Sequence, residues 1–390
     1  MMAAQRFGIE EEYFLADAAS RGAVRKVPPA FIDDAQKAFP DEVQREMLQS
    51  QIEVATAICT TMAEARSALA RLRSGLADIA GRHGLLLLAS GTHPSAIWSR
   101  QRVTEAARYD RLMQELQMIG RRNQLCGLHV HVEVPDEDER IRLMARIMPY
   151  LPLLLALSTS SPFWQGRRTG LMGYRLAAYA ELPRTGLPEL FVEPDEYRSY
   201  IAALVNSGAI KDESYIWWAM RPSMRHPTLE LRIADSCTSL EDTLAIAALY
   251  RCLVRYLLRN PAVNARPAPA TRGIALENFW RAQRYGIHGG FIDGAGTGMR
   301  PVADIVEGWI GRLAEDASAL GCEAELARCG VIARDGTSAD RQLAIHEEAR
   351  QRDGDQAALA ATVDWIAAET RRVEGVERGE ETAQGLLRAC

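Results

Sequence analysis

The sequence predicts an α+β fold, a mainly antiparallel sheet with helices packed on one face. Short β-prone segments dominate the first 237 residues, and the chain beyond residue 238 has mostly helical character. Several strand-like segments alternate polar and apolar residues, which is typical of a sheet with one face on a core. The 390 residues are 47% hydrophobic and 25% charged, so they can bury a sizeable core. We expect a single domain over 1–390, strand-rich mostly within 1–237 and helical over 238–390.

The elements of the first part follow from local patterns. Alternation of polar and apolar residues indicates strands, and apolar residues at helical spacing indicate helices. The helical pattern that begins at residue 62 ends at Gly84, a residue that often follows a helix C-terminus. We expect strands at 7–17, 50–59, 85–90 and 126–134, and helices at 62–84, 101–121 and 136–157, the last kinked or divided near Pro152.

The second part is more helical. Residues 158–212 are irregular apart from a helical piece near 194–205. Turn residues separate two strand-like segments and predict a hairpin. The hairpin strands are expected at 214–220 and 228–235, helices at 239–260, 302–320 and 338–372, a loop-rich segment at 261–300, and a loose tail over the last dozen residues.

Composition excludes several classes of protein. The net charge of −5 is too balanced for a dedicated nucleic-acid binder and too acidic for an anionic membrane surface. The longest apolar stretch, 148–157, is far short of the roughly 20 residues that span a bilayer. Seven scattered cysteines without a CxxC pair fit reduced thiols. We expect a cytoplasmic protein with no nucleic-acid or membrane partner, and a homo-oligomer is compatible with this size.

Familiar catalytic motifs are missing from the sequence. Lys26, Lys37 and Lys211 are the only lysines, and none follows a glycine-rich loop, so a P-loop is excluded. The glycine-rich run at 293–300 does not match the dinucleotide-binding fingerprint. There is neither an HExxH zinc motif nor a G-x-S-x-G nucleophile elbow.

Acids and histidines instead occupy alternating positions within strand-like segments. Side chains two residues apart in a strand point to the same face. A carboxylate facing a core is costly unless it is paired or binds a cation. Several strands cannot each hide uncompensated charge, so we expect one or two shared cation sites on one face of the sheet. The side chains concerned are Glu10, Glu12, Glu53, His129, His131, Glu133, Glu230 and Arg232.

Each strand alone has a simpler interpretation, either an edge strand with exposed glutamates or a hydrogen-bonded core histidine. Together they favour a metal or phosphate site. Carboxylates in excess over imidazoles, without thiolates, favour Mg²⁺ or Mn²⁺ over Zn²⁺. Arg232 lies two residues from Glu230, where a guanidinium can bind a phosphate oxygen. The residues therefore predict ATP-dependent phosphoryl transfer without a P-loop.

Four ordered segments carry a resemblance to a known family. FGIEEEYFLAD, SQIEVATAIC, CGLHVHVEV and RHPTLELRIADSC resemble the bacterial carboxylate–amine ligases of the YbdK type, the second glutamate–cysteine ligase family. The resemblance covers nearly the whole chain and extends to the glutamine synthetase superfamily. It implies a curved, glutamine synthetase-like catalytic sheet, Mg²⁺ or Mn²⁺, and ATP as co-substrate. It also implies amide formation through an acyl phosphate, with L-glutamate and L-cysteine as substrates and γ-glutamylcysteine as product.

The resemblance implies a role for individual residues. Glu10, His129 and Glu230 are expected around the metal on the nucleotide side. Arg232 is expected to contact the transferred phosphate as the catalytic arginine, and His131 to bind ATP with it. The second metal is expected to be held by Glu12, Glu53 and Glu46.

The sequence departs from the family pattern near the expected substrate. In GRRTGLMGYR (166–175), Arg168 replaces an acid and Gly173 replaces a serine, while Arg175 remains. Arg175 and Arg184 are candidates for binding a substrate carboxylate, although both are also compatible with solvated surface arginines. Glu133 stands where the family has a small residue, so it could alter metal or amine binding or point into solvent.

Three other functions use a similar set of side chains. A metal-dependent amide hydrolase also has a His-x-His strand, but it leaves Glu10, Glu12 and Glu230 without a role. A guanidino-type phosphotransferase shares a related sheet and stops after phosphoryl transfer. A nucleotide sensor would keep the ATP site without an acceptor site.

Overall fold

The computed structural model describes residues 5–293 and 298–373, and the predicted C-terminal tail lies outside these ranges. Its main sheet has seven strands in the order β2-β3-β1-β5-β9-β8, with β4 paired to β1. Every pairing in this sheet is antiparallel, so the predicted α+β class is confirmed. The strands are β1 (Phe7–Asp17), β2 (Val43–Arg45), β3 (Gln51–Ala55), β4 (Leu85–Leu88), β5 (Gly127–Glu133), β8 (Met220–Pro222) and β9 (Thr228–Asp235).

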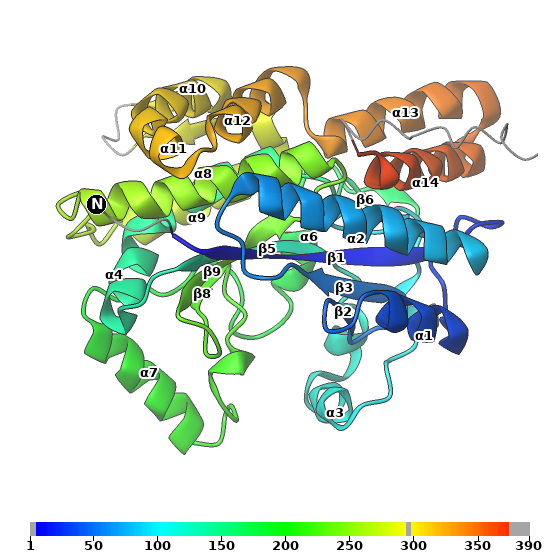
Figure 1. The fold of residues 1–390 in the computed structure, drawn as a ribbon, viewed down its shortest axis with the longest axis horizontal. Coiled ribbons are helices and arrows are strands. Elements are labelled where there is room, and N and C mark those ends of the chain that lie inside the picture. The colour runs from blue at the N-terminus through cyan, green and yellow to red at the C-terminus, as the bar shows by residue number, and fades with distance from the viewer. Residues whose placement is uncertain (1–4, 294–297, 374–390) are drawn as a thin grey trace, which may run out of the picture.

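One face of the sheet packs on helices. In Figure 1, α2 (Met62–Arg82) and α8 (Leu240–Arg259) lie above the sheet, and α13 (Ser338–Asp353) and α14 (Asp355–Arg371) lie on the same side. Alternate strand residues such as Ile9, Val130 and Leu231 are buried in the core of this layer. Because strand side chains alternate between faces, the residues between them point to the other side.

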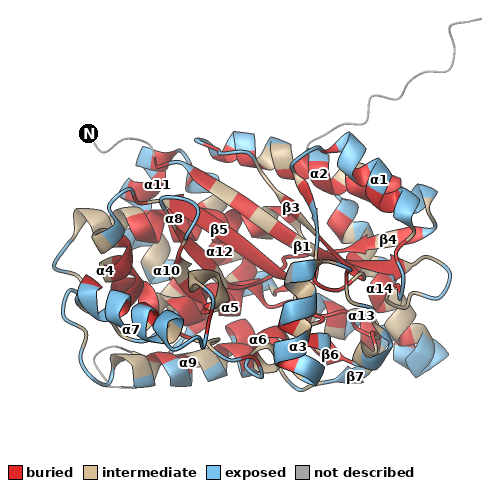
Figure 2. Ribbon diagram, turned by 90° about the horizontal axis from the view of Figure 1, so that it is seen from below, coloured by how far each residue is buried: buried red, intermediate tan, exposed pale blue. Residues whose placement is uncertain are grey.

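The opposite side carries α3 (Ala107–Arg121) and α7 (Pro194–Asn206), which lie below the sheet in Figure 1. Figure 2, seen from this side, shows largely buried strands and many exposed residues on α3 and α7. Within residues 5–293 and 298–373, the polar face of the sheet therefore has no continuous helix layer over it. The smaller elements of the first half are α1 (Pro29–Ala38), α6 (Tyr174–Tyr179), β6 (Phe163–Trp164) and β7 (Arg167–Arg168).

The expected division of the helix at 136–157 is confirmed. A 3₁₀ turn (Met148–Tyr150) separates α4 (Glu137–Ile147) from α5 (Leu151–Ser158), and Pro152 lies in the first turn of α5, where proline is tolerated. The combined segment Glu137–Ser158 is long and apolar enough to cross a membrane by length and composition. However, 83% of its most apolar window is buried inside the protein, so its apolar residues form core.

Several expected elements were wrong. Most of 214–220 is a 3₁₀ turn and irregular chain, and the hairpin strand is β8. The segment 261–300 contains α9 (Thr271–Tyr285) and a small hairpin of β10 (Gly290–Ile292) and β11 (Met299–Pro301). The helix expected at 302–320 is divided into α10 (Val302–Arg312) and α11 (Ala314–Leu320), and α12 (Glu323–Asp335) follows it. The helix expected at 338–372 is also divided, because Gly354 at φ 85° separates α13 from α14.

A buried ion pair joins the sheet to the helix layer. Glu11 on β1 and Arg73 on α2 are both fully buried, and Arg73 Nε donates a hydrogen bond to Glu11 Oε2 at 2.9 Å. Arg73 also donates to the carbonyl of Thr238 at 2.8 Å. Burial opposes ionisation of Glu11, but Arg73 outweighs it and lowers the pKa of Glu11. The acid between Glu10 and Glu12 therefore supports the fold from the opposite face.

Candidate functional site

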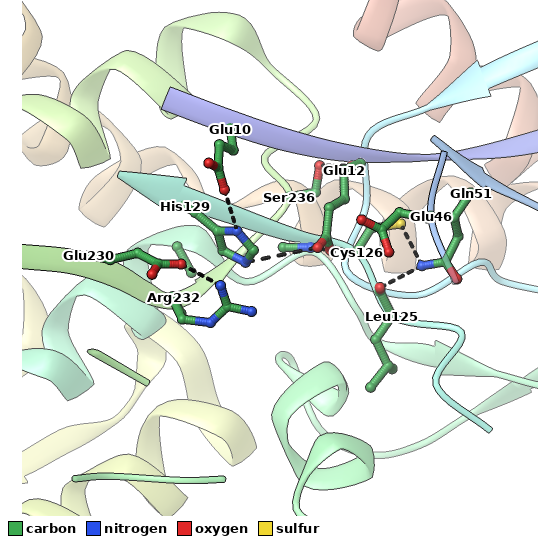
Figure 3. Close-up of polar contacts among 12 residues, drawn as sticks. Glu10, Glu12, Glu46, Gln51, Leu125, Cys126, His129, Glu230, Arg232 and Ser236 are labelled. Carbon is green, nitrogen blue, oxygen red and sulfur yellow. Dashed lines mark hydrogen bonds and ion pairs between the residues drawn. The ribbon is translucent and has the colours of Figure 1, made fainter. Parts of the chain in front are cut away.

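A cavity of about 410 Å³ lies on the polar face of the sheet. Strand residues of β1, β3, β5 and β9 form its floor, and Figure 3 shows several of their side chains converging there. Tyr109, Leu112 and Leu116 of α3, together with Leu182 and Trp217, form a less polar wall. The cavity is thus charged on one side and apolar on the other.

Strand register brings the predicted ligands together. On β1, Glu10 lies opposite His129 of β5, and Glu12 lies opposite Glu53 of β3. On the next pair of strands, His131 lies opposite Glu230. Cross-strand partners have Cβ atoms about 4.5–5.5 Å apart, so this register is sufficient to gather the charges.

The first group of three ligands contains Glu10, His131 and Glu230, whose ligand atoms lie within 4.8 Å of one another. The resemblance placed His129 with Glu10 and Glu230, and that role stays a prediction; in this group of three the histidine is His131, the direct cross-strand partner of Glu230. His131 Nδ1 lies 2.9 Å from the Thr228 hydroxyl, and its Nε2 lies 3.4 Å from Glu10 Oε1. Within the described chain, this buried Nε2 meets no hydrogen-bond partner of good geometry. It is therefore oriented like a ligand atom.

The second group contains Glu12, Glu46 and Glu53, as the resemblance implied. Glu12 Oε2 accepts a hydrogen bond from the Gly127 amide at 2.6 Å. Burial raises the pKa of Glu12, and the Glu46 charge raises it further. Burial and the charges of Glu46 and Glu10 raise the pKa of Glu53 well above its usual range. Three carboxylates this close require protons or a cation between them.

His129 lies between the two groups. Its Nδ1 is 3.2 Å from Glu10 Oε2, and its Nε2 is 3.9 Å from Glu12 Oε1 (Figure 3). Burial lowers the pKa of His129, and the positive charge of Arg232 acts in the same direction. By contrast, the Glu10 carboxylate, whose Oε1 lies 3.4 Å from His131 Nε2, and the charge of Glu230 overcome burial and raise the pKa of His131. His129 can therefore serve either group as a neutral imidazole.

Glu230 is bound by two arginines. Arg221 on β8 lies directly opposite it, and Arg221 Nε donates to Glu230 Oε2 at 2.7 Å. Arg232 Nη1 contacts the other oxygen, Oε1 (Figure 3). Burial opposes ionisation of Glu230, but these guanidiniums lower its pKa well below the usual range. Arg221 was not among the residues predicted from the sequence. The only sequence feature that could have indicated it is its place directly after the hairpin strand expected to pair with the strand of Glu230.

Arg175 lines the cavity but is held by the backbone. Between Leu128 and Val130 the β5–β9 register shifts, so that two steps along β5 match three along β9. Arg175 Nη1 donates at this bulge to the carbonyls of Ala234 at 3.0 Å and Arg232 at 3.3 Å. Arg175 is 4% exposed, which contradicts the interpretation as a solvated surface arginine. Its expected role in substrate binding stays a prediction.

The other expected substrate residues lie apart from the cavity floor. Arg184 Nε donates to the Tyr215 carbonyl at 3.0 Å, and its guanidinium packs on the Trp217 ring. Glu133 pairs with Arg6, outside the cavity lining. Arg168 is exposed in β7, and Gly173 precedes α6 and packs near Thr159. Arg168 is not among the described residues that line the cavity, and nothing in the structure explains why an arginine replaces the acid of the family pattern there.

The donor sets fit hard divalent cations. Both groups offer carboxylate oxygens, with one imidazole in the first, and none of the residues lining the described cavity is a cysteine. Oxygen ligands with few imidazoles suit Mg²⁺ or Mn²⁺. His131 Nε2, which makes no hydrogen bond of good geometry in the described chain, and the clustered acids are the groups that would hold such ions.

Comparison with known proteins identifies the family. The sequence profile of glutamate–cysteine ligase family 2 matches residues 6–362. The chain belongs to this family. A Bradyrhizobium sp. (strain ORS 278) protein with the provisional name glutamate–cysteine ligase 2 is 50% identical over 366 residues, covering 93% of this chain and 87% of its own. A Rhodospirillum rubrum protein with the same provisional name is 45% identical over 380 residues, covering 95% and 97%. The expected enzyme class, an ATP-dependent ligase, is confirmed.

Solved structures confirm the fold. A glutamate–cysteine ligase from Francisella tularensis in complex with AMP superimposes with a TM-score of 0.70 at 12% identity, over 95% of this chain and 90% of that one. A bifunctional glutathione synthetase from Pasteurella multocida gives a TM-score of 0.66 at 16% identity, over 94% and 52%. The expected glutamine synthetase-like ligase fold is therefore present.

Proposed function

We propose that this ligase joins the γ-carboxyl group of L-glutamate to the amine of L-cysteine, with two Mg²⁺ or Mn²⁺ ions at the sheet. The observation that carries the proposal is the pair of ligand groups on one face, Glu10–His131–Glu230 and Glu12–Glu46–Glu53. The names of the family and of its relatives support the choice of glutamate and cysteine.

Phosphoryl transfer comes first in the proposed reaction. Divalent ions held by the two groups of ligands would neutralise phosphate charge that otherwise repels an attacking carboxylate. The substrate carboxylate oxygen bonds to the γ-phosphorus while the bond to the β-bridging oxygen breaks, and ADP leaves. Arg232 is 15% exposed at the cavity floor, where its guanidinium can stabilise charge on the transferred group.

Amide formation follows. The amine attacks the carbonyl carbon of the acyl phosphate and the new C–N bond forms. The C–O bond to phosphate breaks, inorganic phosphate leaves, and the amine nitrogen loses a proton. The apolar wall of Leu112, Leu116, Leu182 and Trp217 limits access of water to one side of this intermediate. A less polar wall also suits an acceptor amino acid with a small, weakly polar side chain.

Release of ADP by the purified protein tests the proposal. We expect release with ATP and Mg²⁺ to require both L-glutamate and L-cysteine, and mass spectrometry to find γ-glutamylcysteine. A pooled-amine screen with glutamate identifies a different acceptor if cysteine is inactive. Amide cleavage without ATP would support a hydrolase instead, and a stable phosphorylated guanidine would support a kinase. Nucleotide binding without turnover of any of these amino acids and amines would support a nucleotide sensor.

A further inference from the structure

Glu230 shares its two carboxylate oxygens between two differently anchored guanidiniums. Arg221 forms a fork: its Nε donates to Oε2 at 2.7 Å and its Nη2 donates to Oε1 at 3.3 Å. Arg232 uses a single nitrogen, Nη1, and contacts Oε1 alone. A bidentate fork fixes the plane of a carboxylate, whereas a single contact does not.

Arg221 has a rigid attachment of its own. Its Nη1 donates to the Ile216 carbonyl at 2.7 Å, and its backbone is paired directly with that of Glu230. In contrast, Arg232 Nε is buried without a hydrogen-bond partner in the described chain. Arg221 is therefore fixed on both sides, and Arg232 can change partner without losing further hydrogen bonds.

Glu230 Oε1 is the oxygen that both Arg232 and a metal ion would bind. It lies 4.0 Å from His131 Nε2, which in turn lies 3.4 Å from Glu10 Oε1. An ion shared by Glu10, His131 and Glu230 would therefore take Oε1 rather than Oε2. Arg232 contacts that same oxygen more closely than Arg221 Nη2, which donates to it at 3.3 Å, so an arriving ion competes chiefly with Arg232.

We propose that Arg221 is a positioning residue that presents Glu230 Oε1 to the metal, while Arg232 is an exchangeable counter-ion that the metal displaces. Once displaced, Arg232 is free to bind the phosphate that accompanies the metal. This division of roles rests on the proposed function, because it presupposes a divalent ion at Glu10, His131 and Glu230.

The two arginines should have opposite effects on metal affinity. Charge alone predicts that removing either cation strengthens binding of a nearby cation. We expect Arg232→Met to strengthen Mn²⁺ binding at one site, and Arg221→Met to weaken it about tenfold or more, as for residues that orient metal ligands. Arg221→Lys keeps the charge but loses the fork, so it should also weaken binding. Titration calorimetry and Mn²⁺ electron paramagnetic resonance without nucleotide measure this directly.

Two references keep the test interpretable. The ion at Glu12, Glu46 and Glu53 should remain bound in every variant and report an intact fold. Arg6→Met removes another arginine–glutamate pair on the same face, that of Arg6 with Glu133, and should leave both affinities unchanged. Unchanged or stronger Mn²⁺ binding by Arg221→Met and Arg221→Lys would overturn the positioning role. Absence of Mn²⁺ binding to the wild-type protein would instead overturn the proposed metal site, and the inference with it.

Discussion

Gly127 and Arg175 approach each other so closely that no side chain fits between them. A Cβ atom built on Gly127 would lie 2.8 Å from Arg175 Cζ and 3.1 Å from His129 Nε2. The Gly127 amide also donates to Glu12 at 2.6 Å. This glycine therefore allows Arg175 to reach the β9 bulge beside both ligand groups.

Substitution of Gly127 should disturb the site more than the fold. In Gly127→Ala, Arg175 must leave the bulge carbonyls, so we expect kcat to fall about 10–100-fold, the scale of a misplacement near 1 Å. Steady-state kinetics with a thermal melt measures the effect. The control is Gly81→Ala, because a Cβ at Gly81 would meet nothing within 4 Å. Equal activity of the two variants would show that the close approach of Gly127 and Arg175 is not needed for catalysis.

Glu230→Gln should abolish ATP-dependent turnover while the protein stays folded. The amide keeps the shape of the carboxylate but loses the charge that a cation needs. The measurement is ADP release, with circular dichroism to check folding. Cys237→Ala is the control, because burial raises the pKa of this thiol well above its usual range and leaves it unreactive. Near-normal turnover by Glu230→Gln would contradict the site.

Glu11→Gln should destabilise the fold without removing a ligand. It leaves Arg73 buried without its counter-charge, which costs about 3–5 kcal/mol. The folded pKa of Glu11 is lowered, so its contribution is complete above the unfolded value of about 4.3 and is lost as pH falls through the folded pKa. The difference from wild type in urea unfolding should therefore shrink only in acid. Asp78→Asn, in an exposed pair with Arg371, should cost less than about 1 kcal/mol.

Metal binding at Glu12, Glu46 and Glu53 should depend on pH. The pKa values of Glu12 and Glu53 are raised, so these groups retain protons at pH values where an ordinary glutamate has lost them. Protons then compete with the ion, and affinity should fall as pH is lowered from above neutrality towards the usual pKa range of glutamate, with protons released on binding. Calorimetry in buffers of different ionisation enthalpy measures that release. An affinity constant over this range, without proton release, would contradict the prediction.

The period of two along a strand was enough to predict which acids share a face. It could not predict which histidine lies nearest Glu230, because that depends on the register between β5 and β9. Arg221 was missed for the same reason, since its role depends on how β8 pairs with β9. Helix α9 was missed because Leu276 and Trp280 lie exposed on it, which obscures its apolar stripe. Local sequence patterns thus indicated most strands and helices, whereas the pairing of strands in the folded sheet determined which side chains lie next to Glu230.

The extra residue in β9 changes the face of the sheet to which the strand's last side chains point. Glu230 faces the cavity, and an uninterrupted strand would turn Asp235 towards the helices. The shift instead pairs Asp235 with Gly127, on the cavity side, where its Oδ2 accepts hydrogen bonds from Ser160 and Ser161. Deleting a single amino acid here would therefore be more harmful than exchanging one, because it would turn the Asp235 carboxyl group towards the apolar helix layer and remove its hydrogen bonds with the Ser160 amide and the Ser161 hydroxyl. Strand length at this point is under as strict a constraint as its composition.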